Sequence, residues 1–225
     1  MGIVNVRKLG SEADDLMYHA SRLSRMSSII VTTDKDLFQA IDDNVKVYNP
    51  TRDEMYERDD IEEMYDIDFD NYIHWRAIQG DNSDNIPGIK GIGPKTASKL
   101  FNEFGSLTAI TNAAAGRNPN GEITGKLATN ICSFGFDRIC KNVYAMALYA
   151  DRVGARKSVI EAVDKFKDVN IRWVKRYLMV NAFVSLMDGK FYNNLNSLSK
   201  PNIDDNRKDV KWRTPVVCGR RFPSD

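Results

Sequence analysis

Seven carboxylates in three separate segments of this 225-residue chain have the residue types and spacing of a metal site. They are Glu12, Asp14 and Asp15; Asp34 and Asp36; and Asp81 and Asp84. No cysteine or histidine ligand set accompanies them in the sequence, so ligation would be through hard oxygen atoms, which suits Mg²⁺ or Mn²⁺ better than Zn²⁺. Two such ions about 4 Å apart can activate a water molecule and stabilise the leaving oxygen of a phosphodiester. The pattern predicts metal-assisted phosphodiester hydrolysis.

A glycine-rich stretch follows the last carboxylate pair. Residues 88–93 read Gly-Ile-Lys-Gly-Ile-Gly, and Pro94 comes next. Glycine permits positive φ and close backbone approach, and proline is tolerated in the first turn of a helix. Exposed amides at the positive end of a helix can bind phosphate. We therefore expect Gly91, Ile92 and Gly93 to hold a nucleic-acid duplex through their backbone.

Charge is divided unevenly along the chain. Residues 1–85 hold 9 Lys and Arg against 19 Asp and Glu, whereas residues 86–225 hold 23 against 12. An acidic part beside a basic part suggests metal-binding carboxylates next to a surface for a polyanion. Ten of the nineteen acids lie between residues 53 and 70, where we expect mostly a solvated helix face and loop.

Composition describes an ordinary globular protein with a real core, since 42% of the residues are hydrophobic and 10% are aromatic. No apolar run approaches the ~20 residues that a membrane span needs, and the N-terminus lacks a signal-peptide pattern. The three cysteines are odd in number and form no metal-type pair. We expect a reduced, cytoplasmic protein with no membrane partner.

Two early elements should position the first five carboxylates. Ser11 is the expected N-cap of a helix, with Asp14 three residues on as in a capping box, although acids at this position also complement the helix dipole. Residues 28–33 are almost all β-branched or apolar, as in a buried parallel strand. Asp34 and Asp36 follow the carboxyl end of that strand, where ligands of open α/β sheets lie. For Asp36, capping of the next helix is the competing interpretation.

The rest of the chain should be mostly helical. The predicted elements are a strand at 45–48, a helix at about 69–79, a helix at 95–104, a loop at 112–125, a helical region at 123–195 and a polar tail from 197. The helix at 69–79 brings Asp81 and Asp84 to its far end. We expect the tail to be weakly ordered and to contact either DNA or a replication protein.

Residues 72–107 resemble the helix-three-turn-helix segment of the flap endonuclease and 5′→3′ exonuclease family, with its preceding Gly-Asp-x-x-Asp-Asn at residues 80–85. The Glu-Ala-Asp-Asp at 12–15 and the Thr-x-Asp-x-Asp at 32–36 resemble the family's acidic motifs. The resemblance covers roughly residues 10–110 and suggests a bacterial or bacteriophage member. The expected location is therefore the cytoplasm of a bacterial or phage-infected host cell.

This resemblance implies an α/β fold: the C-terminal part of a PIN-like 5′-nuclease parallel sheet with flanking helices, followed by an α-helical region with a helix-three-turn-helix motif. The expected parts are residues 1–85 with the metal-binding carboxylates, 86–196 as a helical DNA-binding region, and 197–225 as a basic tail. The implied activity is cutting of DNA at 5′ flaps or ends and removal of RNA primers, in replication and repair.

The resemblance also implies two divalent ions, and a K⁺ ion at carbonyls of the glycine turn. Carried over by motif, the first metal centre uses Glu12, Asp14, Asp15, Asp34 and Asp36, and the second metal uses Asp81 and Asp84. The implied DNA contacts, on branched, 5′-flap or RNA-primed duplexes, are Gly88, Ile89, Lys90, Gly91, Ile92, Gly93, Lys95, Thr96 and Lys99.

One departure from the family pattern matters. Family members begin with two strands that each carry a metal aspartate, and with a helical arch whose basic residues engage the scissile phosphate. This chain begins close to the Glu-Ala-Asp-Asp motif, so we expect either a fragment or one half of a split enzyme whose N-terminal half is a separate polypeptide. Alone, it is expected to bind branched duplex DNA but to cut it poorly.

Two other interpretations stay open. A non-catalytic helix-three-turn-helix DNA-binding module with a vestigial acidic site predicts no divalent-ion site that Asp34→Asn or Asp81→Asn removes. A protein-interaction scaffold predicts no salt-dependent affinity for DNA.

Overall fold

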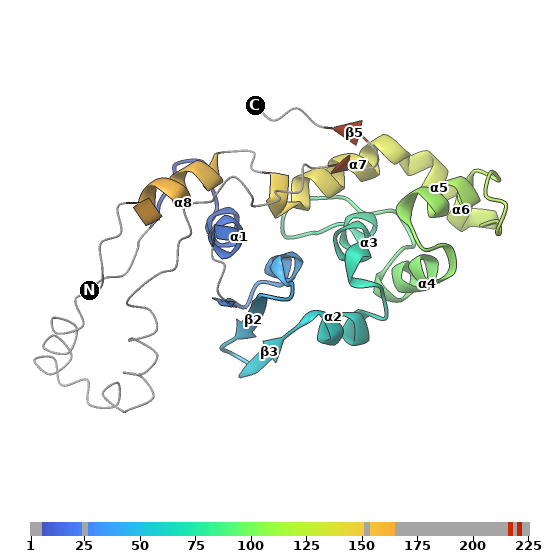
Figure 1. The fold of residues 1–225 in the computed structure, drawn as a ribbon. Helices are drawn as coiled ribbons and strands as arrows, with labels where there is room; N and C mark the ends of the chain where they lie inside the picture. The colour runs from blue at the N-terminus through green and yellow to red at the C-terminus, as the bar shows by residue number, and fades with distance from the viewer. Residues whose placement is uncertain (1–5, 24–26, 151–153, 165–215, 218–219, 222–225) are drawn as a thin grey trace, which may run out of the picture. The chain divides into compact units, whose positions relative to one another are not determined.

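The computed structural model describes residues 6–23, 27–150, 154–164, 216–217 and 220–221 (Figure 1). The described residues fall into two compact units. In the first, helix α1 (Ala13–Leu23) packs against α8 (Ala155–Asp164). The second holds residues 29–150 together with strands β4 (Val216–Val217) and β5 (Arg220–Arg221). The helical pattern predicted for 165–195 and most of the predicted tail lie outside the described residues.

Helix α1 begins at Ala13, one residue later than the predicted N-cap Ser11 would place it. Glu12 precedes the helix, and its backbone amide donates to Asp15 Oδ2 at 3.2 Å. The capping pair is therefore Glu12 and Asp15, and the predicted pair Ser11 and Asp14 is wrong by one position. The predicted and the observed pair use the same interaction, in which the carboxylate three residues after the cap accepts a hydrogen bond from the backbone amide of the cap residue.

A small sheet has its strands in the order β1 (Ser28–Val31), β2 (Val45–Asn49) and β3 (Glu54–Tyr56). Strands β2 and β3 are antiparallel. In β1, Ile30 is 6% exposed, whereas Ile29 and Val31 are 57% and 58% exposed. The prediction of a buried strand is wrong for one face, because successive side chains of β1 alternate between faces and, in the described part of the chain, only the Ile30 face is covered.

Helices form most of the second unit: η1 (Lys35–Ala40), α2 (Arg58–Tyr65), η2 (Phe69–Asn71), α3 (Tyr72–Gln79), α4 (Pro94–Phe104), α5 (Leu107–Ala114), α6 (Gly125–Phe134), α7 (Phe136–Met146) and η3 (Leu148–Ala150). Helix α3 packs against α4 and α7, and along the chain α4 packs on α5, α5 on α6 and α6 on α7 (Figure 1). This sheet with a following helical region confirms the predicted fold class. None of the helices in the described part of the chain has the length and apolarity to cross a membrane.

Helix α3 is the central buried element of the second unit. Its side chains Tyr72 and Trp75 are 2% and 3% exposed. The Tyr72 hydroxyl donates to the Lys35 carbonyl at 2.9 Å, and Trp75 Nε1 donates to Ser98 Oγ at 3.0 Å. Because Lys35 begins η1 and Ser98 lies on α4, α3 links the segment after β1 to the helix after the glycine turn.

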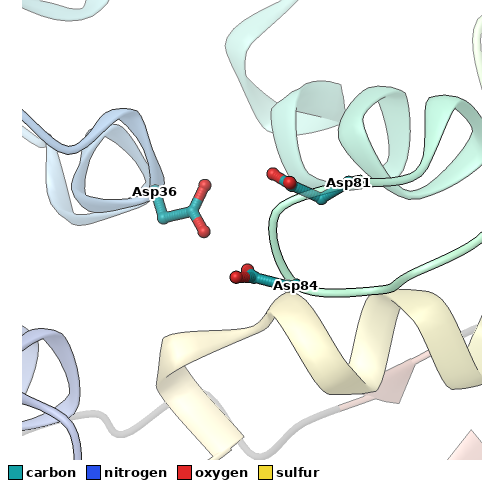
Figure 2. Close-up of side chains that lie close together, drawn as sticks. All are labelled: Asp36, Asp81 and Asp84. Carbon is teal, nitrogen blue, oxygen red and sulfur yellow. The ribbon is translucent and has the colours of Figure 1, made fainter.

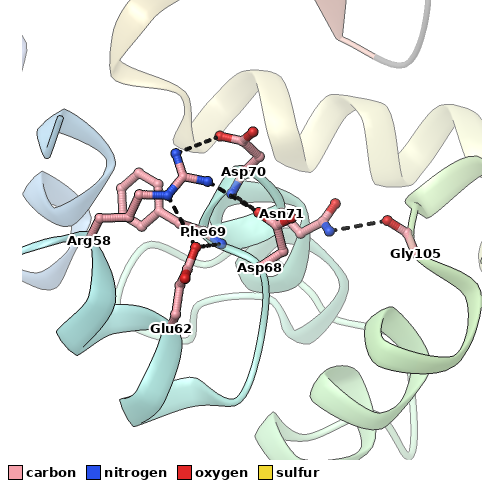
Figure 3. Close-up of polar contacts among 7 residues, drawn as sticks. All are labelled: Arg58, Glu62, Asp68, Phe69, Asp70, Asn71 and Gly105. Carbon is pink, nitrogen blue, oxygen red and sulfur yellow. Dashed lines mark hydrogen bonds and ion pairs between the residues drawn. The ribbon is translucent and has the colours of Figure 1, made fainter. Parts of the chain in front are cut away.

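Part of the acidic segment between residues 53 and 70 is built around one arginine (Figure 3). Arg58 Nε donates to Glu62 at 3.1 Å, and its two terminal nitrogens lie 3.4 Å from Asp68 and Asp70. The guanidinium also lies over the Phe69 ring, 5.1 Å from its centroid. The arginine side chain is 45% exposed, so each ion pair contributes little to stability. These acids lie on an exposed helix and loop, as predicted for most of this segment, and there they pair with Arg58.

Candidate metal centre and nucleic-acid interface

Three carboxylates from two distant segments converge in the second unit. Asp36 lies on η1, and Asp81 and Asp84 lie in the loop after α3, with Asp81 45 residues beyond Asp36 in the sequence. One oxygen of each lies within 4.8 Å of the others. Figure 2 shows the side chains pointing into the space between η1 and this loop. Metal–oxygen distances of about 2.1 Å place ligand oxygens about 3–4 Å apart, so the group fits a divalent ion after small side-chain movements.

A capping bond positions Asp36. Asp34 is the N-cap of η1, and its Oδ1 accepts a hydrogen bond from the Asp36 amide at 2.9 Å. Thr32 Oγ1 in turn accepts from the Asp34 amide at 3.0 Å. The sequence offered capping as the alternative role of Asp36, but the structure gives that role to Asp34. Asp34 is not one of the three converging carboxylates, and its role as a metal ligand stays a prediction.

The loop of Asp81 and Asp84 is closed by its own hydrogen bonds. Asp81 and Ile86 exchange two backbone bonds of 2.8 Å each, and Asn85 takes a φ of 55° to close the turn. Asp81 Oδ1 accepts from the Ser83 amide at 2.9 Å and also from the Ser83 hydroxyl. These bonds hold the Asp81 carboxylate in one orientation.

A cation from α3 bridges two of the three carboxylates. Arg76 Nη2 lies 2.5 Å from Asp36 Oδ1 and 2.7 Å from Asp81 Oδ2. All three side chains are between 17% and 22% exposed, so water screens these contacts only in part. Arg76 offsets the repulsion between the two acids and fixes their separation. Sequence reasoning missed it, although a single cation between Trp75 and Ile78, in a helix stretch that is otherwise apolar, was the available signal.

The three carboxylates differ in acidity. Burial raises the pKa of Asp36 to about 6, against the opposing effect of Arg76 and with a further increase from the neighbouring carboxylates. Hydrogen bonds from Ser83 instead hold the pKa of Asp81 below its ordinary value. Near neutral pH, Asp81 is firmly ionised, while Asp36 takes up a proton after modest acidification. A bound cation would compete directly with that proton.

Divalent-ion binding should weaken as the pH falls through about 6, because the ion needs the ionised Asp36 carboxylate. In ion-free protein, the contribution of Asp36 to the free energy of unfolding increases as the pH falls, which is the opposite trend. The folded pKa of Asp36 is raised from 3.8 to about 6, so its protonation stabilises the fold below about pH 4, and this stability is lost as the pH rises through about 6. Mn²⁺ calorimetry and urea unfolding at several pH values measure the two trends. Asp36→Asn should remove both contributions, and an unchanged pH profile in that variant would contradict the assignment.

The remaining predicted metal ligands belong to the first unit. Glu12 directly precedes α1, and Asp14 and Asp15 lie in its first turn. The Asp15 carboxylate accepts from the Glu12 amide, as described above. The metal-binding role of these three acids stays a prediction.

The predicted phosphate-binding turn follows the carboxylate loop. The Ile92 amide donates to the Ile89 carbonyl at 3.0 Å, and Gly91 between them has a φ of 86°. Gly93 is the N-cap of α4 and has no side chain to accept from the first amides of the helix, and Pro94 is at N1. This arrangement leaves the first amides of α4 to an external acceptor, at the positive end of the helix.

The side chains predicted to contact DNA fall into two groups. Ile89 and Ile92 are 3% and 6% exposed, so they anchor the turn and only their backbone can meet a ligand. Lys90, Lys95 and Lys99 are exposed. Lys95 and Lys99 also line one groove along α4. Thr96 lines the same groove, and the contacts with DNA stay predictions.

Two glycines fasten the carboxylate loop to the turn. A Cβ atom on Gly88 would lie 1.7 Å from the Gln79 carbonyl oxygen, and one on Gly80 would lie 2.3 Å from the Gly88 nitrogen. Such close approach of two backbone segments requires glycine on both. Immediately beyond, the Ile89 amide donates to the Ile78 carbonyl at 2.9 Å. The candidate metal loop and the candidate phosphate turn are therefore held side by side.

Two protein-family models match adjoining parts of the chain. Residues 1–66 match the 5′-3′ exonuclease N-terminal resolvase-like domain, and residues 67–138 match the 5′-3′ exonuclease C-terminal SAM fold. Together, these two halves of one family cover more than half of the chain.

Curated relatives carry related names. DNA polymerase I of Deinococcus radiodurans is 38% identical over 117 residues, which is 51% of this chain and 12% of the polymerase. The 5′-3′ exonuclease of Streptomyces coelicolor is 36% identical over 130 residues, which is 55% of this chain and 42% of the exonuclease. The chain thus spans less than half the length of each of these relatives.

Solved structures agree with these matches. The T5 D15 protein co-crystallised with metal ions has a TM-score of 0.56 and 26% identity, over 70% of this chain and 59% of that one. The T5 5′-exonuclease with divalent zinc ions bound has a TM-score of 0.57 and 27% identity, over 70% and 58%. With both family models matched in order along its sequence, the chain belongs to the 5′-3′ exonuclease family.

Proposed function

We propose that this protein is a structure-specific 5′-nuclease that hydrolyses phosphodiester bonds of DNA or RNA-primed DNA, in replication and repair. The observation that carries the proposal is the convergence of Asp36, Asp81 and Asp84 within 4.8 Å. The same loop is joined through Gly80 and Gly88 to a turn with the features of a phosphate site. Metal ligands and a strand-binding turn in such proximity match the 5′-3′ exonuclease activity that the names of the family and of the Streptomyces coelicolor relative state.

In this proposal Asp36, Asp81 and Asp84 hold a divalent ion, Mg²⁺ or Mn²⁺. When bound, such an ion lowers the pKa of a coordinated water and stabilises the charge that develops on the phosphate. Arg76 keeps Asp36 and Asp81 apart at a fixed distance and offsets their charge before the ion arrives. The roles of Glu12, Asp14, Asp15 and Asp34 as further metal ligands, and a second divalent ion, are also part of the proposal.

The duplex is proposed to bind along the turn and α4. The amides after Gly93 meet one phosphate, and the side chains of Lys90, Lys95 and Lys99 meet its neighbours on a branched or 5′-flap substrate. A K⁺ ion at the turn carbonyls is also part of the proposal. One of these carbonyls, that of Lys90, accepts a bond from Asn130 Nδ2 at 2.8 Å, so α6 helps to keep the turn in shape.

Removal of the groove lysines should reduce the salt dependence of DNA binding. Each phosphate contact contributes a slope of about −0.9 to the dependence of log affinity on log salt concentration. Lys95→Ala with Lys99→Ala should therefore reduce the slope by about 2 and weaken binding of a 5′-flap duplex at low salt. Fluorescence anisotropy across a salt series measures both quantities. The control is Lys46→Ala, since Lys46 lies on β2 and pairs with Glu57. An equal reduction of the salt slope by this control would contradict the assignment.

The function is tested with a labelled 5′-flap duplex and Mg²⁺ or Mn²⁺. Release of 5′ products that depends on the ion supports the nuclease. DNA binding without any divalent-ion site would instead support the non-catalytic binding module. The prediction that a separate N-terminal half raises the activity is tested in the same assay by adding that polypeptide. Contact of the tail with a replication protein and a cytoplasmic location stay predictions.

A further inference from the structure

Two amide side chains fasten both carboxylate segments to α7, a helix that carries none of the predicted ligands. Asn142 on α7 donates from Nδ2 to the Ala77 carbonyl at 3.0 Å and to the Pro87 carbonyl at 2.8 Å. Gln39 on η1 donates to the Met146 carbonyl at 3.1 Å and accepts from the Leu148 amide at 2.9 Å. Each amide therefore makes two bonds to the backbone of segments at least 55 residues away in sequence.

The bonds of Asn142 enclose the loop that holds Asp81 and Asp84. Ala77 lies four residues before Asp81, and Pro87 lies three residues after Asp84. The Ala77 carbonyl is among the last of α3, where carbonyls lack a partner within the helix. Asn142 is 6% exposed, so its two bonds are sheltered from water and join both ends of the loop at one point. Figure 2 shows α7, in pale yellow, passing beside this loop.

Gln39 fixes the other segment. It lies three residues after Asp36 on the same 3₁₀-helix, where residues three apart are stacked on one side. Its bonding partners are the last residue of α7 and the first residue of η3, so it also satisfies a terminal carbonyl of α7. These bonds hold η1 to the end of α7 at a point one helical turn from Asp36. They therefore fix the position of Asp36 relative to α7.

We infer that Asn142 and Gln39 are positioning residues, which set the separation of Asp36 from Asp81 and Asp84 by tying both segments to one helix. The inference rests on the proposed function, because it takes these carboxylates to hold a divalent ion. Asn142 lies beyond the residues that the family models match. Mg²⁺ demands near-ideal octahedral geometry, so a change in the separation of these carboxylates should reduce the affinity for the ion.

The test is calorimetric titration of the purified protein with Mn²⁺. Asn142→Leu should weaken Mn²⁺ binding about tenfold, because two buried backbone carbonyls lose their donor and the carboxylate loop is no longer held to α7. Val143→Ala is the matched control for lost stability, since Val143 is fully buried on the same helix and makes no such bonds. Equal Mn²⁺ affinities in Asn142→Leu and Val143→Ala would overturn the inference. Wild-type protein without a Mn²⁺ site would overturn the proposed function instead.

A second measurement separates positioning from a purely structural role. Ca²⁺ accepts flexible coordination whereas Mg²⁺ does not, so displaced carboxylates should lose more affinity for Mg²⁺ than for Ca²⁺. Gln39→Ala, at a half-buried position that should leave the fold intact, is expected to lower the ratio of Mg²⁺ to Ca²⁺ affinity at least several-fold, as is Asn142→Leu. An unchanged ratio in Gln39→Ala would contradict a positioning role even if Asn142→Leu does not fold.

Discussion

Asp81→Asn should reduce ion-dependent cleavage of a 5′-flap duplex by about 10²–10³-fold, because a bound ion contributes several kcal/mol to transition-state stabilisation and each 1.4 kcal/mol is about tenfold in rate. Asparagine has nearly the same shape, so the loop closed by Asp81 and Ile86 should persist while the charge that faces Asp36 is lost. Initial rates under saturating Mg²⁺ measure the effect.

The control for this variant is Asp70→Asn. Asp70 is 62% exposed, pairs with Arg58 and is not one of the three converging carboxylates. Cleavage by Asp70→Asn should match that of the wild type within about twofold. If Asp81→Asn protein retained the wild-type rate, the assignment of Asp81 as a metal ligand would be wrong.

Gly88→Ala should destabilise the fold by at least about 3 kcal/mol, which is a large stability effect for a single added methyl group. The added Cβ would lie 1.7 Å from the Gln79 oxygen, and backbone atoms cannot move aside as a flexible side chain can. Separation of the two segments would also strain the adjacent bond between Ile89 and Ile78. Urea unfolding measures the loss, and Mn²⁺ binding should fall with it because the carboxylate loop moves.

Gly93→Ala is the matched control for Gly88→Ala. A Cβ at Gly93 meets nothing within 4 Å, and the φ of −106° is one that alanine adopts. As an N-cap substitution it should cost about 1 kcal/mol or less. Similar losses of stability in the two variants would show that the close contact between Gly88 and Gln79 is not what fixes the turn.

Local sequence patterns predicted much of the candidate site. The spacing of Asp81 and Asp84, followed by the glycine turn and Pro94, depends on backbone rules that act over a few residues, and the observed turn follows them. Patterns at this range could not decide between Asp34 and Asp36. Two acids two residues apart at a helix start can each cap or face outward, and the choice depends on which one Arg76 meets after folding.

The residues that the sequence did not reveal act across long separations. Arg76 pairs with Asp36 only because η1 lies against α3, and Asn142 reaches Pro87 only because α7 packs on α3. A local pattern contains no information on such pairings. The exposed side of β1 has the same origin, since whether an apolar strand is covered on both faces depends on its neighbours and not on its own residues.

Anomalous diffraction from crystals of the protein grown with Mn²⁺ tests the central claim most directly. The account predicts an anomalous peak at about 2.2 Å from carboxylate oxygens of Asp36, Asp81 and Asp84, beside the turn that begins at Gly88. The peak should be absent in crystals of Asp81→Asn protein. A map with Mn²⁺ bound elsewhere, and none among these three carboxylates, would contradict it.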